Sequence, residues 1–295
     1  QAMKNSERWR IMSINGKSDA EIKQSFEVPA KMKVFTWKGE RDTIMKPKDS
    51  IIYYKHFLQT GMMAMEPQTG HVKAWVGGIN YKYFQYDHVG QGARQVGSTF
   101  KPFVYATAID RLQKSPCDMI MDSPFTILKG DNNDKDWTPN NSDGKYRGLV
   151  SMKKALANSI NTVSARLIHE VGAPAVVEMA KNLGVTSNIP NRPAIALGAV
   201  EITVQEMVAA FSTFANEGVY IKPQLITKIE DKNGVVIYQG VEESHDVVNK
   251  DVAYSVIKLM EGVTESGTGS RLRWAASAPS NFLTGVPYNI KGPVA

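Results

Sequence analysis

The sequence is poor in the side chains from which disulfides and metal centres are built. Cys117 is the only cysteine among 295 residues, which excludes an internal disulfide and any zinc site made of several cysteines. Nothing in its neighbourhood supports a nucleophilic thiol, so we expect a buried structural cysteine. The five histidines do not fall at metal-ligand spacing. The sequence therefore predicts neither a metal site nor a cofactor.

Long apolar runs and dense blocks of charge are also missing. No uninterrupted apolar run reaches the ~18 residues that a membrane-spanning helix needs, and no signal peptide is visible. Because the chain opens on Gln1 without an obvious start, we expect that an N-terminal anchor preceded it. Lysine and arginine total 35 against 29 acidic residues, and this basic excess is dispersed along the chain. Nucleic acid is therefore not an expected partner.

What is present is enough apolar sequence, 42%, for a sizeable core. Residues 1–50 are more charged and less periodic than the rest, which favours a linker or small β subdomain ahead of a main domain at 51–295. Apolar runs bounded by turn residues predict hairpins at 34–45, 61–76 and 223–238. Apolar positions at helical spacing predict helices at 53–58, 98–112, 151–158, 162–170, 173–183, 204–216 and 252–263.

The strongest chemical signal is the S-x-x-K pattern formed by Ser98 and Lys101 directly after Gly97. Residues three apart on a helix share a face, so we expect Ser98 Oγ and Lys101 Nζ to meet. A lysine in a desolvated pocket has its pKa lowered and can accept a proton from serine. The pattern predicts a serine nucleophile with a lysine base, an arrangement that requires no histidine.

The four-residue pattern is short, and its context decides which copy carries chemistry. S-x-x-K also begins at Ser142, Ser151 and Ser255, which fall in a polar turn, at a helix N-cap and on an exposed helical face. Only Ser98 follows a glycine at the start of a mostly apolar helix. A helix that is apolar on nearly all sides is buried, so it would present Ser98 from the middle of a domain.

Two other segments carry candidate polar groups. Residues 129–148 form a long polar stretch without helical or strand periodicity, and loops of this length are commonly functional. Ser159 and Asn161 lie between two predicted helices, where a hydroxyl and a carboxamide two residues apart can both point into one cleft.

Five short motifs, taken together and in this order, resemble the transpeptidase domain of class A penicillin-binding proteins from about residue 51 to the end of the chain. They are R-Q-V-G-S-T-F-K-P at 94–102, W-T-P-N at 137–140, A-L-A-N-S-I-N at 155–161, A-L-G at 196–198 and F-A-N-E-G at 214–218. The resemblance implies an α+β fold, with an antiparallel sheet between helical layers and an active cleft at the sheet edge.

The resemblance also implies a serine D-Ala-D-Ala transpeptidase or carboxypeptidase. Ser98 would attack the terminal amide of a peptidoglycan stem peptide, and an amine from a neighbouring stem would take the acyl group and cross-link two glycan strands. Lys101 would be the base for acylation. Ser159 would relay a proton, and Asn161 would hold Lys101 and the substrate amide. The backbone N–H of Ser98 would donate to the oxyanion.

Further expectations follow from the same resemblance. Trp137 and Asn140 would bind substrate. The partners would be stem peptides, glycan strands, β-lactam antibiotics and other cell-wall synthesis proteins. The protein would act in the bacterial periplasm or on the outer face of the cytoplasmic membrane. A preceding glycosyltransferase domain is left open.

One family motif does not occur in these 295 residues. Every Thr-Gly lacks the preceding lysine of the family's K-T-G motif, so we expect a transpeptidase domain without its C-terminal K-T-G strand region. Two alternatives keep the serine chemistry. A β-lactam sensor or scaffold of the same fold would acylate without turnover. A serine β-lactamase is less favoured, because S-I-N stands where class A β-lactamases have S-D-N and no E-x-x-L-N stretch occurs.

Overall fold

The computed structural model describes residues 1–130 and 133–273, and the chain divides into two compact units. The first unit holds Gln1–Thr60 together with Gly78–Gln85, and the second holds Gly61–Gly77 and continues from Tyr86. The boundary predicted at residue 50 thus falls inside a helix of the first unit, α3 (Pro47–Lys55).

The first unit is a small α+β body. Besides α3 it contains α1 (Glu7–Ile14), α2 (Asp19–Ser25), β1 (Ala30–Thr36) and β2 (Gly39–Met45). The two strands pair antiparallel in continuous register across a tight turn, which confirms the hairpin predicted at 34–45. A small core of Trp9, Ile22 and Phe26 joins the first two helices.

The second unit carries the candidate chemistry and most of the apolar core. Its helices are α4 (Lys101–Leu112), α5 (Met152–Ala157), α6 (Asn161–Val171), α7 (Ala173–Asn182), α8 (Val204–Ala215) and α9 (Lys250–Glu265), with short 3₁₀ turns η1 (Gly97–Phe100), η2 (Pro193–Leu197) and η3 (Ser270–Arg273). Its strands are β3 (Met62–Met65), β4 (Val72–Val76), β5 (Arg94–Gln95), β6 (Met119–Asp122), β7 (Gly148–Ser151), β8 (Glu201–Ile202), β9 (Val219–Ile221), β10 (Lys228–Glu230), β11 (Val236–Gln239) and β12 (Ser244–Asp246).

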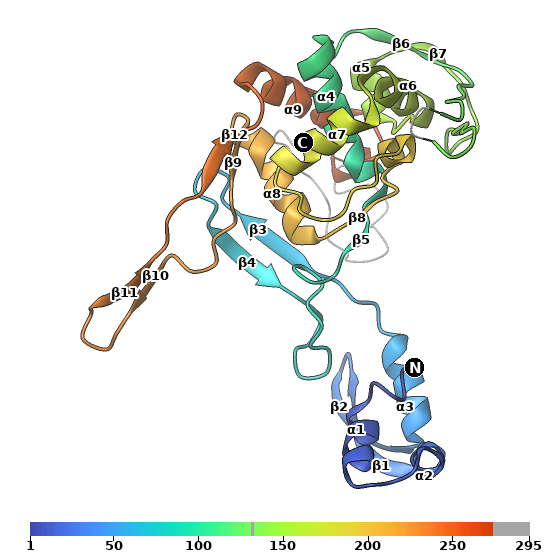
Figure 1. The fold of residues 1–295 in the computed structure, drawn as a ribbon, viewed down its shortest axis with the longest axis vertical. Coiled ribbons are helices and arrows are strands. Elements are labelled where there is room, and N and C mark those ends of the chain that lie inside the picture. Colours follow the sequence, from blue (N-terminus) through green and yellow to red (C-terminus); the bar gives the residue numbers. More distant parts are fainter. Residues whose placement is uncertain (131–132, 274–295) are drawn as a thin grey trace. The chain divides into compact units, whose positions relative to one another are not determined.

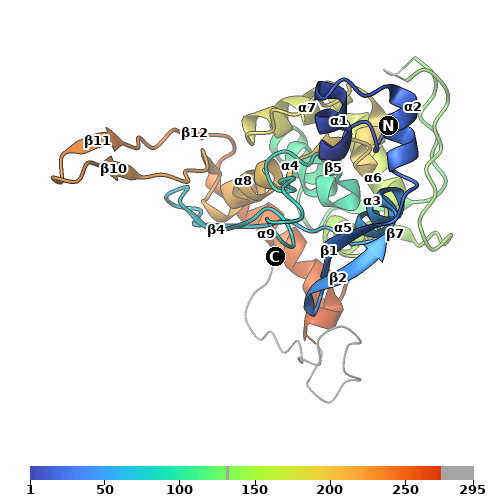
Figure 2. The same ribbon diagram turned by 90° about the horizontal axis from the view of Figure 1, so that it is seen from below.

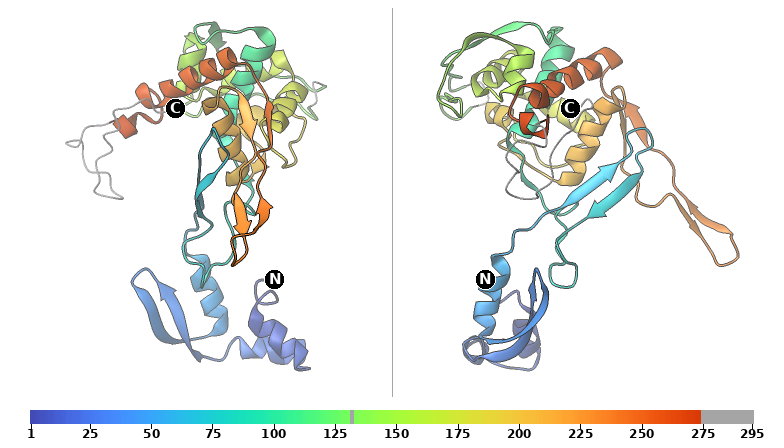
Figure 3. Two further views of the ribbon diagram at one scale, coloured as in Figure 1. Left: turned by 90° about the vertical axis from the view of Figure 1, so that its left-hand side faces the viewer. Right: turned by 180° about the vertical axis from the view of Figure 1, so that it is seen from behind.

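Helix α4 is the centre of this unit, as its apolar sequence predicts (Figure 1). Its first nine residues, Lys101 to Ile109, are all buried. It packs against α6, α7 and α9, while α9 also packs along α5 and α8 (Figure 3). Because apolar side chains project on every face, α4 is stable only when surrounded by other helices. The residue at its amino end is therefore attached to a helix that is buried along its first nine residues.

The strands of the described residues pair as antiparallel two-stranded ladders, so the fold is α+β as predicted. The ladders of the second unit are β3–β4, β5–β8, β6–β7, β9–β12 and β10–β11. The β3–β4 pair confirms the hairpin predicted at 61–76 and packs against α8. The β10–β11 pair, seen in Figure 2, confirms the third hairpin. Its first strand begins at Lys228 rather than near 223.

The expectation of a buried Cys117 is wrong, because this side chain is exposed. Cys117 lies in a hydrogen-bonded turn ahead of β6, in which the backbone N–H of Asp118 donates to the carbonyl of Ser115. The Asp118 carboxylate in turn accepts from the backbone N–H of Ser115, and the N–H of Cys117 donates to Ser115 Oγ. The polar turn keeps the short thiol at the surface. Within 1–130 and 133–273, no helix combines the length and apolar character needed to cross a bilayer.

Candidate active site

Ser98 lies in the 3₁₀ turn η1, immediately before α4, and its side chain is exposed. The approach to this turn is fixed by two glycines in left-handed conformation, Gly97 and Gly198, with φ of +56° and +72°. The N–H of Gly97 donates to the carbonyl of Gly198 at 3.2 Å. A Cβ on Gly198 would lie 1.9 Å from Gly97 O, so only glycine allows the two backbones to pack this closely.

Lys101 is the first residue of α4, and only 1% of it is exposed. Its Nζ donates three hydrogen bonds, to Ser159 O at 2.7 Å, Ser159 Oγ at 2.9 Å and Asn161 Oδ1 at 2.7 Å. None of these acceptors carries a charge. Burial therefore lowers the Lys101 pKa from 10.5 to about 8 without compensation from a carboxylate. A lysine with this pKa is neutral in about one molecule in ten at pH 7, far more often than an ordinary lysine.

Ser159 lies in the turn between α5 and α6 and has a φ of +55°, which is unusual for a residue with a side chain. In this left-handed conformation both its carbonyl oxygen and its hydroxyl face Lys101. The hydroxyl also lies 2.9 Å from Ser98 Oγ. Ser159 is therefore placed between Ser98 and Lys101.

This placement differs from the direct contact between Ser98 and Lys101 that the S-x-x-K spacing predicts. In the described residues the two side chains are connected through the hydroxyl of Ser159. The physical reason is that a buried ammonium has three donors to satisfy. The turn that holds Ser159 and Asn161 offers three acceptors, and the lysine side chain extends to meet them.

The predicted loop reaches the cluster through its backbone. Asn161 Nδ2 donates to the carbonyl of Asn140 at 2.8 Å, while the Asn140 side chain accepts a hydrogen bond from the hydroxyl of Tyr146. Trp137 exchanges two backbone hydrogen bonds with Ile127, and its side chain packs against the main core. The predicted substrate contacts of Trp137 and Asn140 stay predictions.

Sequence reasoning missed two residues behind this cluster, Asp122 and Asn141. Asn141 Oδ1 accepts from the backbone N–H of Asn161 at 2.9 Å, and Asn141 Nδ2 donates to Asp122 Oδ1 at 2.7 Å. The sequence carries no signal for Asp122, because three apolar residues precede it in β6; only the structure shows that exposed and buried positions alternate along this strand and place the carboxylate on the buried side. A charged residue in register with core positions indicates a satisfied polar network.

Ser98, Lys101 and Ser159 open onto a cavity of about 320 Å³, a volume suited to a small ligand. The rest of the lining is mainly apolar. In the described part of the chain it is formed by Pro102, Leu156, Phe211, Met260, Val263, Thr264, Thr268, Gly269 and Leu272. This combination gives a polar reacting edge and an apolar wall.

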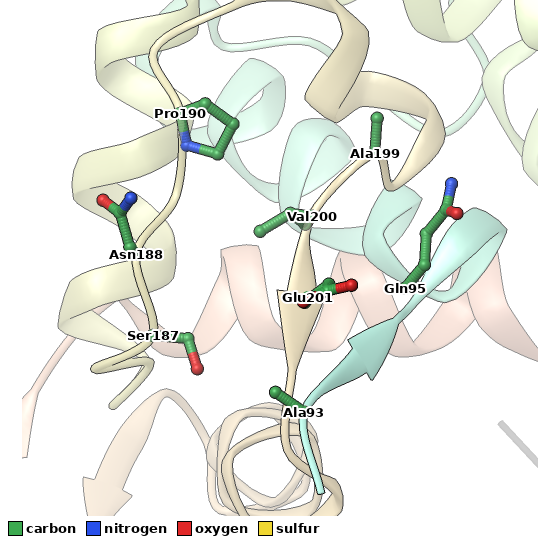
Figure 4. A pocket seen from close by; sticks show the side chains of 8 residues that line it. All are labelled: Ala93, Gln95, Ser187, Asn188, Pro190, Ala199, Val200 and Glu201. Carbon is green, nitrogen blue, oxygen red and sulfur yellow. The ribbon is translucent and has the colours of Figure 1, made fainter. Parts of the chain in front are cut away.

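A second, larger pocket of about 570 Å³ lies along the β5–β8 ladder (Figure 4). Gln95 and Glu201 belong to this ladder, and Glu201 points towards β5 while Val200 points towards the segment Ser187–Pro190. Ser98, Lys101 and Ser159 are not among the residues that line this pocket. We therefore take the smaller cavity as the candidate active site. Within 1–130 and 133–273, no three histidine, cysteine or acidic side chains gather in a way that could hold a metal.

Comparison with known proteins matches one family model to the N-terminal part of the chain and another to the rest. Residues 1–58 match the family described as the penicillin-binding protein middle domain, and residues 60–280 match the penicillin-binding protein transpeptidase domain. Penicillin-binding protein 1A of Aquifex aeolicus is 35% identical over 216 residues, which are 72% of this chain and 29% of that protein. The protein of the same name from Neisseria flavescens is 32% identical over 254 residues, which are 84% of this chain and 31% of that protein.

The chain thus spans about three-tenths of the length of these curated relatives. Among solved structures, penicillin-binding protein 1A from Haemophilus influenzae has a TM-score of 0.67 at 25% identity, over 73% of this chain and 37% of that chain. These matches confirm the resemblance carried by the short motifs. The chain belongs to the penicillin-binding protein transpeptidase family, with a middle domain ahead of the transpeptidase domain.

Proposed function

We propose that this chain is the transpeptidase part of an enzyme that cross-links peptidoglycan, with Ser98 as the acylated nucleophile. The observation that carries the proposal is the hydrogen-bonded path from Ser98 through Ser159 to Lys101 at the edge of the 320 Å³ cavity. A serine linked to an amine of lowered pKa is an arrangement that activates a nucleophile without histidine. Membership of the family supports the same reaction class.

The hydrogen-bond partners of Lys101 determine the route by which Ser98 is activated. Ser159 O and Asn161 Oδ1 are carbonyl oxygens that only accept hydrogen bonds, so they retain the two N–H groups of a neutral Lys101. The lone pair of Nζ then faces the Ser159 hydroxyl at 2.9 Å. Ser159 donates its proton to Lys101 and receives the proton of Ser98. In this scheme Lys101 is the base and Ser159 is the relay.

The proposed acylation step balances with these groups alone. Ser98 Oγ forms a bond to the carbonyl carbon between the last two D-alanines, and its proton moves through Ser159 to Lys101. The C–N bond then breaks, and the leaving D-alanine amine takes this proton back along the same path. In the second step an amine of a neighbouring stem attacks the ester carbonyl and passes one proton to Lys101. The bond from the carbonyl carbon to Ser98 Oγ then breaks, and Lys101 returns this proton through Ser159 to Ser98.

Two further groups have proposed roles in binding the reacting amide. The backbone N–H of Ser98, at the start of η1, is the proposed donor to the developing oxyanion. The carboxamide of Asn161 donates one N–H to the carbonyl of Asn140, and its oxygen accepts from Lys101. Its second N–H is left to donate to the substrate amide. Asn161 would thereby align the substrate with the proton path.

The experiment that tests this proposal is mass spectrometry of the full-length protein after incubation with benzylpenicillin. We expect one covalent adduct on the peptide that contains Ser98, and none in a Ser98→Ala variant. Ser142→Ala is the matched control, because Ser142 begins another S-x-x-K pattern in an exposed turn. An adduct that persists in Ser98→Ala and disappears in Ser142→Ala would overturn the assignment.

A second measurement separates the transpeptidase from its rivals. Incubation with a donor stem peptide and an amine acceptor should release D-alanine and form the cross-linked product over many turnovers. A sensor or scaffold would form the penicillin adduct without this turnover. A β-lactamase would instead release hydrolysed penicillin repeatedly.

The wider biological context is part of the same proposal. The substrates would be stem peptides on glycan strands, and β-lactams would act as inhibitors that acylate Ser98. The site of action would be the periplasm or the outer face of the cytoplasmic membrane, beside other cell-wall synthesis proteins. Penicillin-binding proteins 1A of similar sequence are more than three times as long as the matched region, so a further domain, such as a glycosyltransferase, is proposed for the whole protein.

A further inference from the structure

Asp122 is a buried carboxylate whose oxygens both accept hydrogen bonds. Oδ1 accepts from Asn141 Nδ2 at 2.7 Å and from Thr162 Oγ1 at 2.6 Å, and Oδ2 accepts from the backbone N–H of Arg147 at 2.9 Å. The guanidinium of Arg147 lies 3.5 Å from Oδ2. Burial alone would raise the Asp122 pKa, but these donors together hold it below its usual value. Asp122 is therefore ionised and accepts hydrogen bonds only.

An acceptor-only group at this position fixes which way Asn141 points. Asn141 Nδ2 donates to Asp122 and to the carbonyl of Lys145 at 2.8 Å, so both of its N–H groups face pure acceptors. Its carbonyl oxygen must then face the opposite side. There it accepts from the backbone N–H groups of Asn161 and Thr162, at 2.9 and 3.2 Å.

These two N–H groups are the first of α6, whose own N-cap residue, Ile160, supplies no side-chain acceptor. Asn141 thus caps α6 from a different segment of the chain, which satisfies donors that a helix start leaves free. Asn161, as the first residue of α6, has its backbone held by this contact. Its side chain is held by the neighbouring residue Asn140, whose carbonyl accepts from Asn161 Nδ2 at 2.8 Å.

The direction set by Asp122 extends to Lys101. Because Nδ2 of Asn161 is committed to the carbonyl of Asn140, Oδ1 faces Lys101 Nζ at 2.7 Å. If residues 140 and 141 moved, the carboxamide of Asn161 would be free to turn its N–H groups towards the ammonium. Two donors would then face each other in a buried site, which costs the full desolvation of an unpaired group.

We propose that Asp122 is a positioning residue, which fixes Asn141 and through it holds Asn161 in the orientation that keeps Lys101 on the proton path. The inference rests on the proposed function, because it assigns Asp122 a part in the Ser98 reaction. A carboxylate is required at this position. In Asp122→Asn, an NH₂ group replaces one of the two oxygens. In one orientation of the carboxamide this group faces the donors of Asn141 and Thr162, and in the other it faces the backbone N–H of Arg147.

The test is a double-mutant cycle on the rate constant of acylation by benzylpenicillin, separated from the binding constant by stopped-flow measurement on the full-length protein. Asp122→Asn should lower this rate constant by about 100-fold, since a misplacement of about 1 Å at a reacting group costs on that order. In an Asn161→Ala background, the same Asp122→Asn change should lower it by less than about twofold, because residues that act through one another are not additive.

Glu206→Gln is the control for a general loss of stability. Glu206 is another partly buried carboxylate, which accepts hydrogen bonds from Thr186, Ser187 and Thr203, and it has no contact with the path to Lys101. This variant should unfold more easily and yet acylate at the wild-type rate. All rates are measured at a temperature at which circular dichroism shows each variant folded.

The outcomes separate the two proposals. Absence of any adduct on wild-type Ser98 would overturn the proposed function itself. Suppose instead that wild-type Ser98 forms the adduct, and that the rate losses caused by Asp122→Asn and Asn161→Ala multiply in the double variant. The proposed function would then stand, and the positioning role of Asp122 would be overturned. If Asp122→Asn does not fold, Asn141→Ala provides the same cycle with Asn161→Ala, and additive effects there would overturn the inference equally.

Discussion

Ser159 provides two of the three acceptors for the buried ammonium of Lys101, its carbonyl oxygen at 2.7 Å and its hydroxyl at 2.9 Å. It does so from a left-handed backbone conformation with a φ of +55°. For a residue with a Cβ this conformation costs ~1–2 kcal/mol, and such conformations cluster where function requires them. The strain and the position between Ser98 and Lys101 belong together, because in this backbone conformation both oxygens face the lysine.

The first prediction concerns the pH dependence of acylation. Because burial lowers the Lys101 pKa to about 8, the neutral base accumulates as pH rises through this value. The acylation rate constant should therefore rise with pH and level off above an apparent pKa of about 8. Stopped-flow rates with benzylpenicillin between pH 6 and pH 10 test this. Lys101→Arg should lose roughly 10²–10⁴-fold in rate, because arginine stays protonated.

Lys154→Arg is the matched control, because Lys154 is the lysine of another S-x-x-K pattern and its side chain is exposed. This variant should leave the pH profile of the acylation rate unchanged. A wild-type profile that is flat across this pH range would contradict the assignment of Lys101 as the base.

The second prediction compares two substitutions of Ser159. Both Ser159→Ala and Ser159→Gly remove the hydroxyl between Ser98 and Lys101, so both should slow acylation by about 10²-fold or more. They differ in stability, because glycine adopts positive φ without the Cβ penalty. Ser159→Gly should be more stable than Ser159→Ala by about 1 kcal/mol in denaturant unfolding. Equal stability of the two variants would show that the left-handed conformation carries no strain.

Much of the fold is predictable from the sequence, because hydrophobic periodicity is a local signal. The predicted hairpins and the long helices occur within a few residues of their expected ends, and α4 is the buried helix that its apolar sequence indicates. The roles of Gly97 and Gly198 illustrate the limit. Both are visible as glycines, but the closeness of their backbones is a contact between segments a hundred residues apart.

The site was predictable only where its residues lie close together in the sequence. Ser98 with Lys101, and Ser159 with Asn161, stand out as local patterns, and the structure brings them together. The insertion of Ser159 between Ser98 and Lys101 depends on how a turn far along the chain packs against α4. Asp122 was missed because a single aspartate in a short strand shows its importance only once its donors, up to 40 residues away, are in place.

The third prediction concerns the backbone contact beneath Ser98. Gly198→Ala places a Cβ 1.9 Å from Gly97 O, so the turn that carries Ser98 must shift. We expect acylation to slow by about 10²-fold. Gly234→Ala is the matched control, because Gly234 has a similar φ of +83° in the β10–β11 turn but no heavy atom within 4 Å of the added Cβ. Similar acylation rates for the two variants would show that the close approach to Gly97 is unimportant.

The last prediction links stability to the protonation of Lys101. Its pKa is about 8 in the folded protein and 10.5 without burial, so the unfolded chain binds this proton more tightly. The free energy of unfolding therefore rises with pH wherever the two states differ in bound protons. The destabilisation is fully present below about pH 8 and disappears as pH approaches 10.5. From about pH 7 to about pH 9.5 the gain should be on the order of 2 kcal/mol.

Hydrogen exchange of the α4 peptide in denaturant, repeated at several pH values, measures this increase in the free energy of unfolding in the helix that contains Lys101. The burial of Tyr105 opposes it at higher pH, because burial raises the pKa of that tyrosine and the unfolded chain loses the phenolic proton first. The comparison therefore uses Lys101→Met, which retains Tyr105 and lacks the amine. The difference in slope between the two proteins isolates Lys101. A slope that is the same in both would mean that Lys101 keeps its ordinary pKa, and the base of the proposed reaction would have to be sought elsewhere.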